Sequence, residues 1–132
     1  MTKKELIMST LEKMGYTPEI DDDGDIKVLF QMKTIYAMTG DDEEPYISML
    51  LPQFHEVEDG EEALAVAVCN KMTREYKMMK VFIDQTFKNV SASCEFYYAS
   101  DEDLELNISK ALHMLGIVRS AFREELSELA EE

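Results

Sequence analysis

The last quarter of the chain, residues 100–132, has the pattern of one long amphipathic helix. Ser100 and the acidic residues after it suit a helix start, because Ser or Asp side chains accept hydrogen bonds from the free N–H groups of the first turn. About 30 residues at 1.5 Å each give ~45 Å, as long as a domain of this size is wide. We therefore expect a sheet, formed by the preceding strands, on which this helix lies. The apolar stripe consists of Leu104, Ile108, Ala111, Leu115, Val118, Phe122, Leu126 and Leu129.

Length and composition limit the number of cores. The chain has 132 residues, of which 45% are hydrophobic, enough for one core and too few for two. We expect a single domain over 1–132, with the last few residues frayed.

The charge balance and the cysteines point to a cellular location. With 28 acidic and 13 basic residues the net charge is -15, which disfavours nucleic-acid and membrane-surface partners. No apolar run approaches the ~20 residues that span a bilayer, and the N-terminus enters an amphipathic helix without a signal-peptide pattern. Cys69 and Cys94 lack metal or disulfide spacing and are predicted to be buried thiols in a reducing compartment. The predicted location is cytoplasmic.

The order of elements follows from periodicity and turn signals. Helices are predicted over 3–14, where Gly15 ends the first, and over 61–76. Pro18 cannot donate a ladder hydrogen bond, so the short strand at 16–20 is expected at an edge of the sheet. The residues from Asp22 to Asp25 predict a hairpin turn. Pro52 is expected to end a strand. The remaining strands are predicted over 26–32, 34–39, 46–51, 79–84 and 90–98. Between them we expect a tight connection at 33–34 and an exposed loop at 40–45. A further connection at 53–60 is expected to bury Phe54 and Val57.

Strands joined by short turns favour an antiparallel sheet and an α+β fold. The predicted order is helix, three or four strands, helix, two strands, helix. The cleanest alternation is at 90–98, where Val90, Ala92, Cys94, Phe96 and Tyr98 share one face, which is expected to meet the closing helix.

A possible calcium loop is rejected in favour of a hairpin. Glu19, Asp21, Asp23 and Gly24 occupy positions 1, 3, 5 and 6 of such a loop, but position 12 is Phe30, where a bidentate carboxylate is needed. The carboxylates at 41–44 and at the C-terminus are expected to be solvated, although clustered carboxylates can bind cations weakly. We predict no metal site.

Residues for catalysis or for a cofactor do not form a pattern. His55 and His113 have no second ligand at metal spacing, and no nucleophile can be paired with a base in a named role. The isolated glycines form no phosphate-binding loop. We therefore predict no catalytic residues, no cofactor and no enzyme.

Two features suggest a protein-binding surface. The first is a set of methionines beside the strands and the second helix, which fit either core filling, the favoured alternative, or a surface that accepts varied apolar partners. The second is a group of basic residues in an acidic chain, which fits either an interface rim or a solvated helix end. The methionines are Met32, Met38, Met49, Met72, Met78 and Met79, and the basic residues are Lys71, Arg74, Lys77 and Lys80.

Several segments resemble the YbjN family of small bacterial proteins. These are 11–16 leading into 23–26, and Cys69-Asn70-Lys71 followed by the strand 79–84. The resemblance implies a fold like that of type III secretion chaperones, which are small, acidic, usually homodimeric and bind extended segments of other proteins. The family also carries a sensory-transduction regulator label that specifies no chemistry, and it supplies no catalytic motif. The turn at 85–89 departs from the family because it lacks glycine, so we expect the last hairpin to be built differently.

The leading hypothesis is that the chain is a non-enzymatic, chaperone-like protein-interaction module. It is expected to form a homodimer, and a regulatory role is compatible with this function. The alternative is a small-molecule or metal-responsive regulator that binds its ligand between sheet and helix. Helix 61–76 is apolar over more of its circumference than one sheet contact covers. This helix and the strand after it, 79–84, are therefore predicted to form the dimer interface, unless the helix is buried within one protomer. The predicted interface residues are Ala63, Val66, Ala67, Lys71, Arg74, Lys77 and Lys80.

Overall fold

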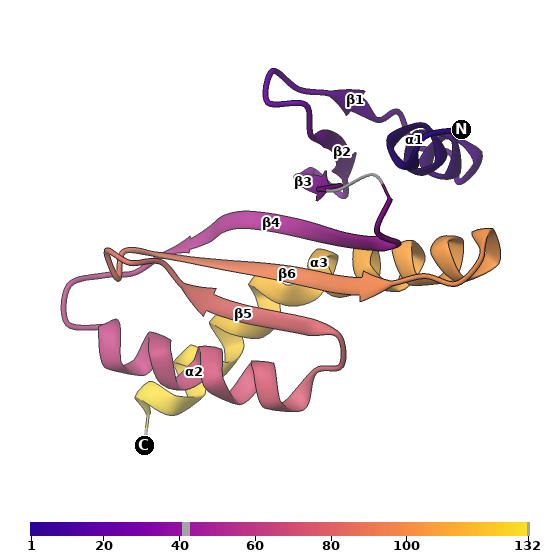
Figure 1. Ribbon diagram of the computed structural model, residues 1–132. Coiled ribbons are helices and arrows are strands. Elements are labelled where there is room, and N and C mark those ends of the chain that lie inside the picture. Colours follow the sequence, from indigo (N-terminus) through magenta and orange to yellow (C-terminus); the bar gives the residue numbers. More distant parts are fainter. Residues whose placement is uncertain (41–42, 132) are drawn as a thin grey trace.

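The computed structural model describes residues 1–40 and 43–131 and has the predicted α+β architecture (Figure 1). Over these residues one antiparallel sheet has the strand order β1-β2-β3-β4-β6-β5. No helix in this part of the chain is long and apolar enough to cross a membrane. The elements are α1 (Lys3–Lys13), β1 (Glu19–Ile20), β2 (Ile26–Phe30), β3 (Lys33–Met38), β4 (Tyr46–Glu56), α2 (Glu62–Glu75), β5 (Met79–Ile83), β6 (Asn89–Tyr97) and α3 (Asp101–Ala130).

Helix α3 forms as its stripe predicts and lies against the sheet. Ser100 caps it, because the Ser100 hydroxyl accepts a hydrogen bond from the backbone N–H of Asp103 at 3.1 Å. The predicted stripe is buried from Leu104 to Leu126, with Leu112 added. The helix contacts β4, β6 and α2 and runs behind the strands in Figure 1. The expectation of a sheet beneath the closing helix is confirmed.

The core is a row of small and medium side chains that runs across five strands. Ile26 pairs with Ala37, Ala37 with Met49, Met49 with Cys94, and Cys94 with Met79. All five are buried. Because side chains alternate along a strand, this register places one face of each of these five strands against the helices. Both cysteines are free and buried, as predicted.

Of the first two hairpin turns, one lies where the sequence predicts it and the other does not. At 21–25 the prediction is confirmed: one oxygen of Asp21 accepts hydrogen bonds from the backbone N–H groups of Asp23 and Asp25, both at 2.9 Å, and β1 pairs with β2. The connection predicted at 33–34 is wrong, since the turn lies at Gln31 and Met32. Both have positive φ, 49° and 66°, the backbone of a two-residue turn that usually contains Asn or Gly. Without those residues the turn has no sequence signal.

Strand β4 does not end at Pro52, and this prediction is wrong as well. The strand runs to Glu56 through an irregularity: Gln53 has φ 48°, and its N–H donates to the Ser91 hydroxyl at 2.8 Å. A bulge accommodates the missing N–H of proline, so pairing with β6 resumes at His55. Phe54 and Val57 are buried as predicted.

Helix α2 closes the outer edge of β5. The Thr73 hydroxyl accepts from the N–H of Val81 at 2.9 Å and donates to the carbonyl of the same residue at 3.1 Å. A side chain therefore satisfies the backbone groups at the centre of this edge, where another strand would otherwise add.

The last hairpin is built around Asp84 instead of glycine. One Asp84 oxygen accepts hydrogen bonds from the Thr86 hydroxyl at 2.7 Å and from the backbone N–H groups of Thr86 and Lys88, both at 3.2 Å. The other accepts from the Asn89 amide at 3.1 Å. These bonds, the one from Thr86 foremost, lower the pKa of Asp84 to about 2.

We expect Asp84→Asn to destabilise the protein at neutral pH and to change its acid sensitivity. A carboxyl with a lowered folded-state pKa stabilises the fold above its unfolded pKa of about 4 and loses this contribution as pH falls toward about 2. The difference in the free energy of unfolding between the wild type and the variant should therefore shrink over that range. Urea denaturation from pH 7 to pH 2.5 measures it, and a difference that stays constant or grows on acidification would contradict the turn's dependence on charge.

Candidate protein-binding site

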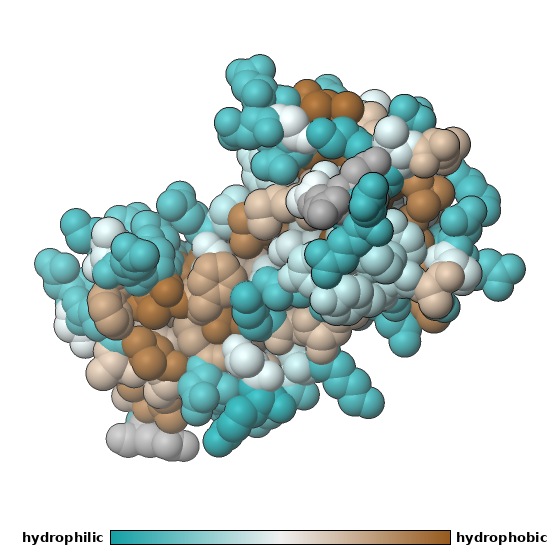
Figure 2. Space-filling model, viewed as in Figure 1, coloured by the Kyte–Doolittle hydropathy of each residue, from teal (hydrophilic) through white to brown (hydrophobic). Residues whose placement is uncertain are grey.

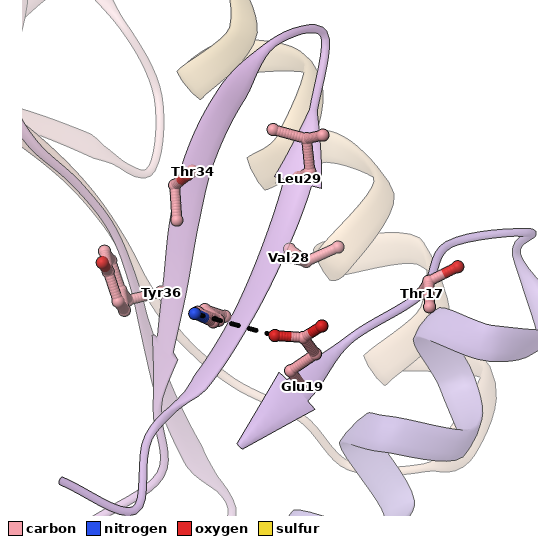
Figure 3. A pocket seen from close by; sticks show the side chains of 7 residues that line it. Thr17, Glu19, Val28, Leu29, Thr34 and Tyr36 are labelled. Carbon is pink, nitrogen blue, oxygen red and sulfur yellow. Dashed lines mark ion pairs between the residues drawn. The ribbon is translucent and has the colours of Figure 1, made fainter. Parts of the chain in front are cut away.

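The sheet face opposite the helices is the first candidate surface, called the open face here. It carries the side chains that alternate with the buried row: Leu29 of β2, Tyr36 of β3, Leu50 of β4, Glu95 and Tyr97 of β6, and Phe82 of β5. Leu29 is 66% exposed, Tyr97 63% and Phe82 36%. In Figure 3 Thr34 and Tyr36 lie along β3 and Leu29 along β2, with α3 on the far side of the strands.

Glu95 organises the centre of the open face. Its carboxylate pairs with the Lys80 ammonium at 2.8 Å and is hydrogen-bonded to Tyr46, and the bond with Lys80 is the main cause of its lowered pKa. The Tyr97 hydroxyl donates to the Glu44 carboxylate at 3.2 Å, and the rings of Tyr46 and Tyr97 lie 5.1 Å apart. These contacts hold the side chains in place before any partner arrives, which lowers the entropic cost of binding.

The outward face of α2 is the second candidate surface. Ala63, Val66, Ala67 and Asn70 are exposed at helical spacing, and Val66 is 41% exposed. Figure 2 shows hydrophobic residues gathered over the N-terminal half of α2, with hydrophilic residues over its C-terminal half. The inner face carries Ala65, Val68, Cys69 and Met72 and is buried. Thus α2 has an apolar stripe on each side, one covered and one uncovered.

The predicted basic cluster is divided between several environments. Arg74 lies on the outward face of α2, while the Lys71 ammonium is 2.6 Å from the Glu125 carboxylate of α3. Lys77 lines a surface pocket of about 570 Å³ with Tyr76 and Met114. Lys80 is on the open face. The structure brings Ala63, Val66, Ala67 and Arg74 together, and places Lys80 with Glu95 instead.

The methionines divide between core and surface. Met49, Met72 and Met79 are buried, whereas Met38 and Met78 are half-buried and Met32 is 94% exposed at its turn. Met78 packs against the core, so core filling accounts for four of the six.

The cysteines and histidines lie on four different elements, Cys69 on α2, Cys94 on β6, His55 on β4 and His113 on α3. Burial raises the pKa of Cys69 to about 11 and that of Cys94 to about 12, so neither thiol is a ready nucleophile. His55 lies 3.0 Å from the Glu61 carboxylate and packs on the Phe122 ring, next to the start of α2, while His113 is exposed on α3. In the described part of the chain, no three His, Cys, Asp or Glu side chains are grouped so as to hold a metal ion.

Two pockets lie on either side of β3. One, of about 240 Å³, lies over β2 and β3 and contains the ion pair of Glu19 with Lys27, whose charged atoms are 3.6 Å apart (Figure 3). The other, of about 340 Å³, lies between β3 and the bulged part of β4. Sequence reasoning missed both pockets and the Glu95 group. Glu95 alternates with the buried residues of β6, so the side of the strand that it occupies follows from the sequence, but its partner Lys80 comes from cross-strand register.

Comparison with known proteins gives a family. Residues 2–128 match the family model described as T3SS (YopN, CesT) and YbjN peptide-binding chaperone 1. No curated protein sequence matches the chain.

Three solved structures share the fold. YbjN from E. coli superposes with a TM-score of 0.70 at 9% identity, over 95% of this chain and 92% of that one. An uncharacterised protein from Methanothermobacter thermautotrophicus gives 0.57 at 13% identity, over 93% and 98%. ExsC, solved as the ExsC-ExsE complex, gives 0.59 at 13% identity, over 89% and 90%. Because the family model spans nearly the whole sequence, the chain belongs to the family of T3SS and YbjN peptide-binding chaperones.

Proposed function

We propose that this protein binds extended segments of other polypeptides without catalysing a reaction, and that it acts in the cytoplasm as a homodimer. The observation that carries the proposal is the open face. Leu29, Tyr97 and Phe82 expose apolar and aromatic surface there, beside hydrogen-bonding groups that are already ordered. Aromatic side chains of this kind contribute strongly to protein interfaces.

An extended segment suits this surface better than a small ligand does. The face runs across strands from β2 to β5, and its exposed side chains are spread along it instead of converging on one deep cavity. Membership of a peptide-binding chaperone family supports the same class of ligand, and ExsC was solved in a complex with ExsE. The free, buried cysteines are consistent with a reducing compartment. A regulatory effect would follow from capture and release of the bound polypeptide.

The dimer is proposed to form through the outward face of α2. This surface lies beside β5, on the side of the sheet that faces the core, so it leaves the open face available. Ala63 and Ala67 are small enough for close approach of a second α2, and Val66 supplies the apolar contact. Arg74 at the end of the same stripe would form the rim. Two-fold pairing buries the same patch on both copies.

The function is tested with a displayed library of random twelve-residue peptides panned against the purified protein. We expect recovered peptides to bind with micromolar affinity in fluorescence anisotropy. Replacing Leu29 and Tyr97 together by serine should weaken binding at least tenfold, because it removes two exposed apolar contacts. Leu106→Ser, at a residue 54% exposed on α3, is the matched control and should leave affinity unchanged.

Failure to recover any binding peptide would overturn the proposed function. Stabilisation in a thermal-shift screen of metals and metabolites, without peptide binding, would instead support a small-molecule or metal-responsive regulator.

A further inference from the structure

The pocket between β3 and β4 results from local loss of pairing, and we call it the notch. Strand β3 begins at Lys33, but its register with β4 covers only Tyr36 to Met38. Beyond Leu50, β4 contains Pro52, which has no N–H to donate, and Gln53, whose N–H is directed to Ser91. The notch is therefore open along residues 33–35 of β3, and its volume is about 340 Å³.

The ends of the sheet are less suited to an added strand. At β5, the Thr73 hydroxyl occupies the backbone groups of Val81. At the opposite end, β1 has only two residues and follows Pro18. Short, proline-flanked or covered edges resist strand addition. The notch is an interior gap beside residues 33–35 of β3, which lie outside the register with β4, so an extended segment placed there has the β3 backbone as its neighbour.

The charge of the notch is opposite to that of the protein. Lys33 and Arg119 line it, and none of its lining residues is acidic. In the part of the chain that the structure describes, neither cation makes an ion pair, and the Lys33 ammonium only approaches the carbonyl of Gln31 at 3.4 Å. In a chain with a net charge of -15, two unpaired cations in one notch favour an anionic partner.

We propose that the notch binds an extended segment of a partner polypeptide that carries an acidic side chain. The backbone of the segment lies along residues 33–35 of β3, and its carboxylate is held by Lys33 and Arg119. Thr34 and Tyr36 connect the notch with the open face, so one segment can continue from one surface to the other. This inference rests on the proposed function and adds the chemistry of the partner, because main-chain bonds give affinity and side-chain charge gives selectivity.

The charge requirement is tested with the best peptide from the displayed library and its version with glutamate and aspartate replaced by glutamine and asparagine. We expect the acidic peptide to bind the wild type at least tenfold more tightly than the neutral one. Replacing Lys33 and Arg119 by glutamine should remove this preference. The control replaces Lys110 and Arg123, which are exposed on α3, and should keep the preference despite the same change in net charge.

The place of binding is tested by protection of a single thiol. The native cysteines are buried, with raised pKa values, so they should not compete for a maleimide at pH 7. Saturating peptide should slow modification of the thiol introduced by Thr34→Cys at least tenfold. It should not affect the thiol introduced by Ser127→Cys, at an exposed position on α3.

The outcomes separate the two proposals. If no library peptide binds, the proposed function is overturned and this inference with it. Three results would overturn the notch while peptide binding stands. They are peptides that bind without a charge preference, a charge preference that persists in the Lys33 and Arg119 variant, and a thiol at position 34 that the peptide does not protect.

Discussion

Replacing Phe122 by alanine is expected to lower the free energy of unfolding by about 3–5 kcal/mol, the usual range for a fully buried aromatic side chain. Phe122 is 0% exposed. Its ring meets that of Phe54 nearly edge-on at a centroid distance of 5.6 Å, and that of His55 at 5.0 Å. It thus packs the long helix against the part of β4 that follows the bulge.

The loss has two sources. Alanine leaves a cavity that the surrounding elements fill only in part, and the edge-on contact with Phe54 is lost. The variant also uncovers His55, whose Nδ1 is buried without a hydrogen-bond partner among the described residues. Water reaching this atom would offset a small part of the cost.

Urea denaturation at one protein concentration measures the effect, since unfolding of a dimer depends on concentration. Leu106→Ala on the same helix is the control. Leu106 is 54% exposed, and alanine is a good helix former, so the change should stay within about 0.5 kcal/mol. A loss below about 1 kcal/mol for Phe122→Ala would mean that α3 is not packed on β4 as described.

The second large effect is expected on assembly. The wild type should be a dimer at micromolar concentration, and Val66→Glu should weaken dimerisation at least a hundredfold. Val66 lies in the middle of the outward stripe of α2, between Ala63 and Asn70. In a two-fold interface the substitution appears twice, so two carboxylates are desolvated close together. The side chain is 41% exposed in the protomer, so the folded monomer should tolerate the change.

Light scattering gives the mass and circular dichroism verifies the fold. Leu106→Glu adds the same charge on a different surface and should leave the dimer intact. A wild-type mass near 15.2 kDa would exclude the dimer. A Val66→Glu protein that stays dimeric would place the interface elsewhere. Pairing through the outer edge of β5 is disfavoured in either case, because the Thr73 hydroxyl occupies the backbone groups of Val81 there.

Local patterns predicted the elements that depend on local signals. The stripe from Leu104 to Leu126 is buried as a unit, because helical periodicity alone decides which residues share a face. Ser100 caps α3, and Gly15 takes a positive φ after α1, for reasons confined to one turn of chain. The Asp21 turn likewise needs only its own side chain.

What the tertiary structure decided is where distant segments meet. The turn at Gln31 and Met32 contains no residue typical of its backbone conformation. Strand β4 continues through Pro52 because the Ser91 hydroxyl of β6 accepts a hydrogen bond from the N–H of Gln53. The same bulge separates β4 from β3 and opens the notch that Lys33 and Arg119 line. Periodicity reports which side of a strand a residue occupies, but register with a strand far along the chain depends on the energy of the whole sheet. For that reason the helices, strands and core could be predicted from sequence, while the pairing of Lys80 with Glu95 and the shape of the binding surface could not.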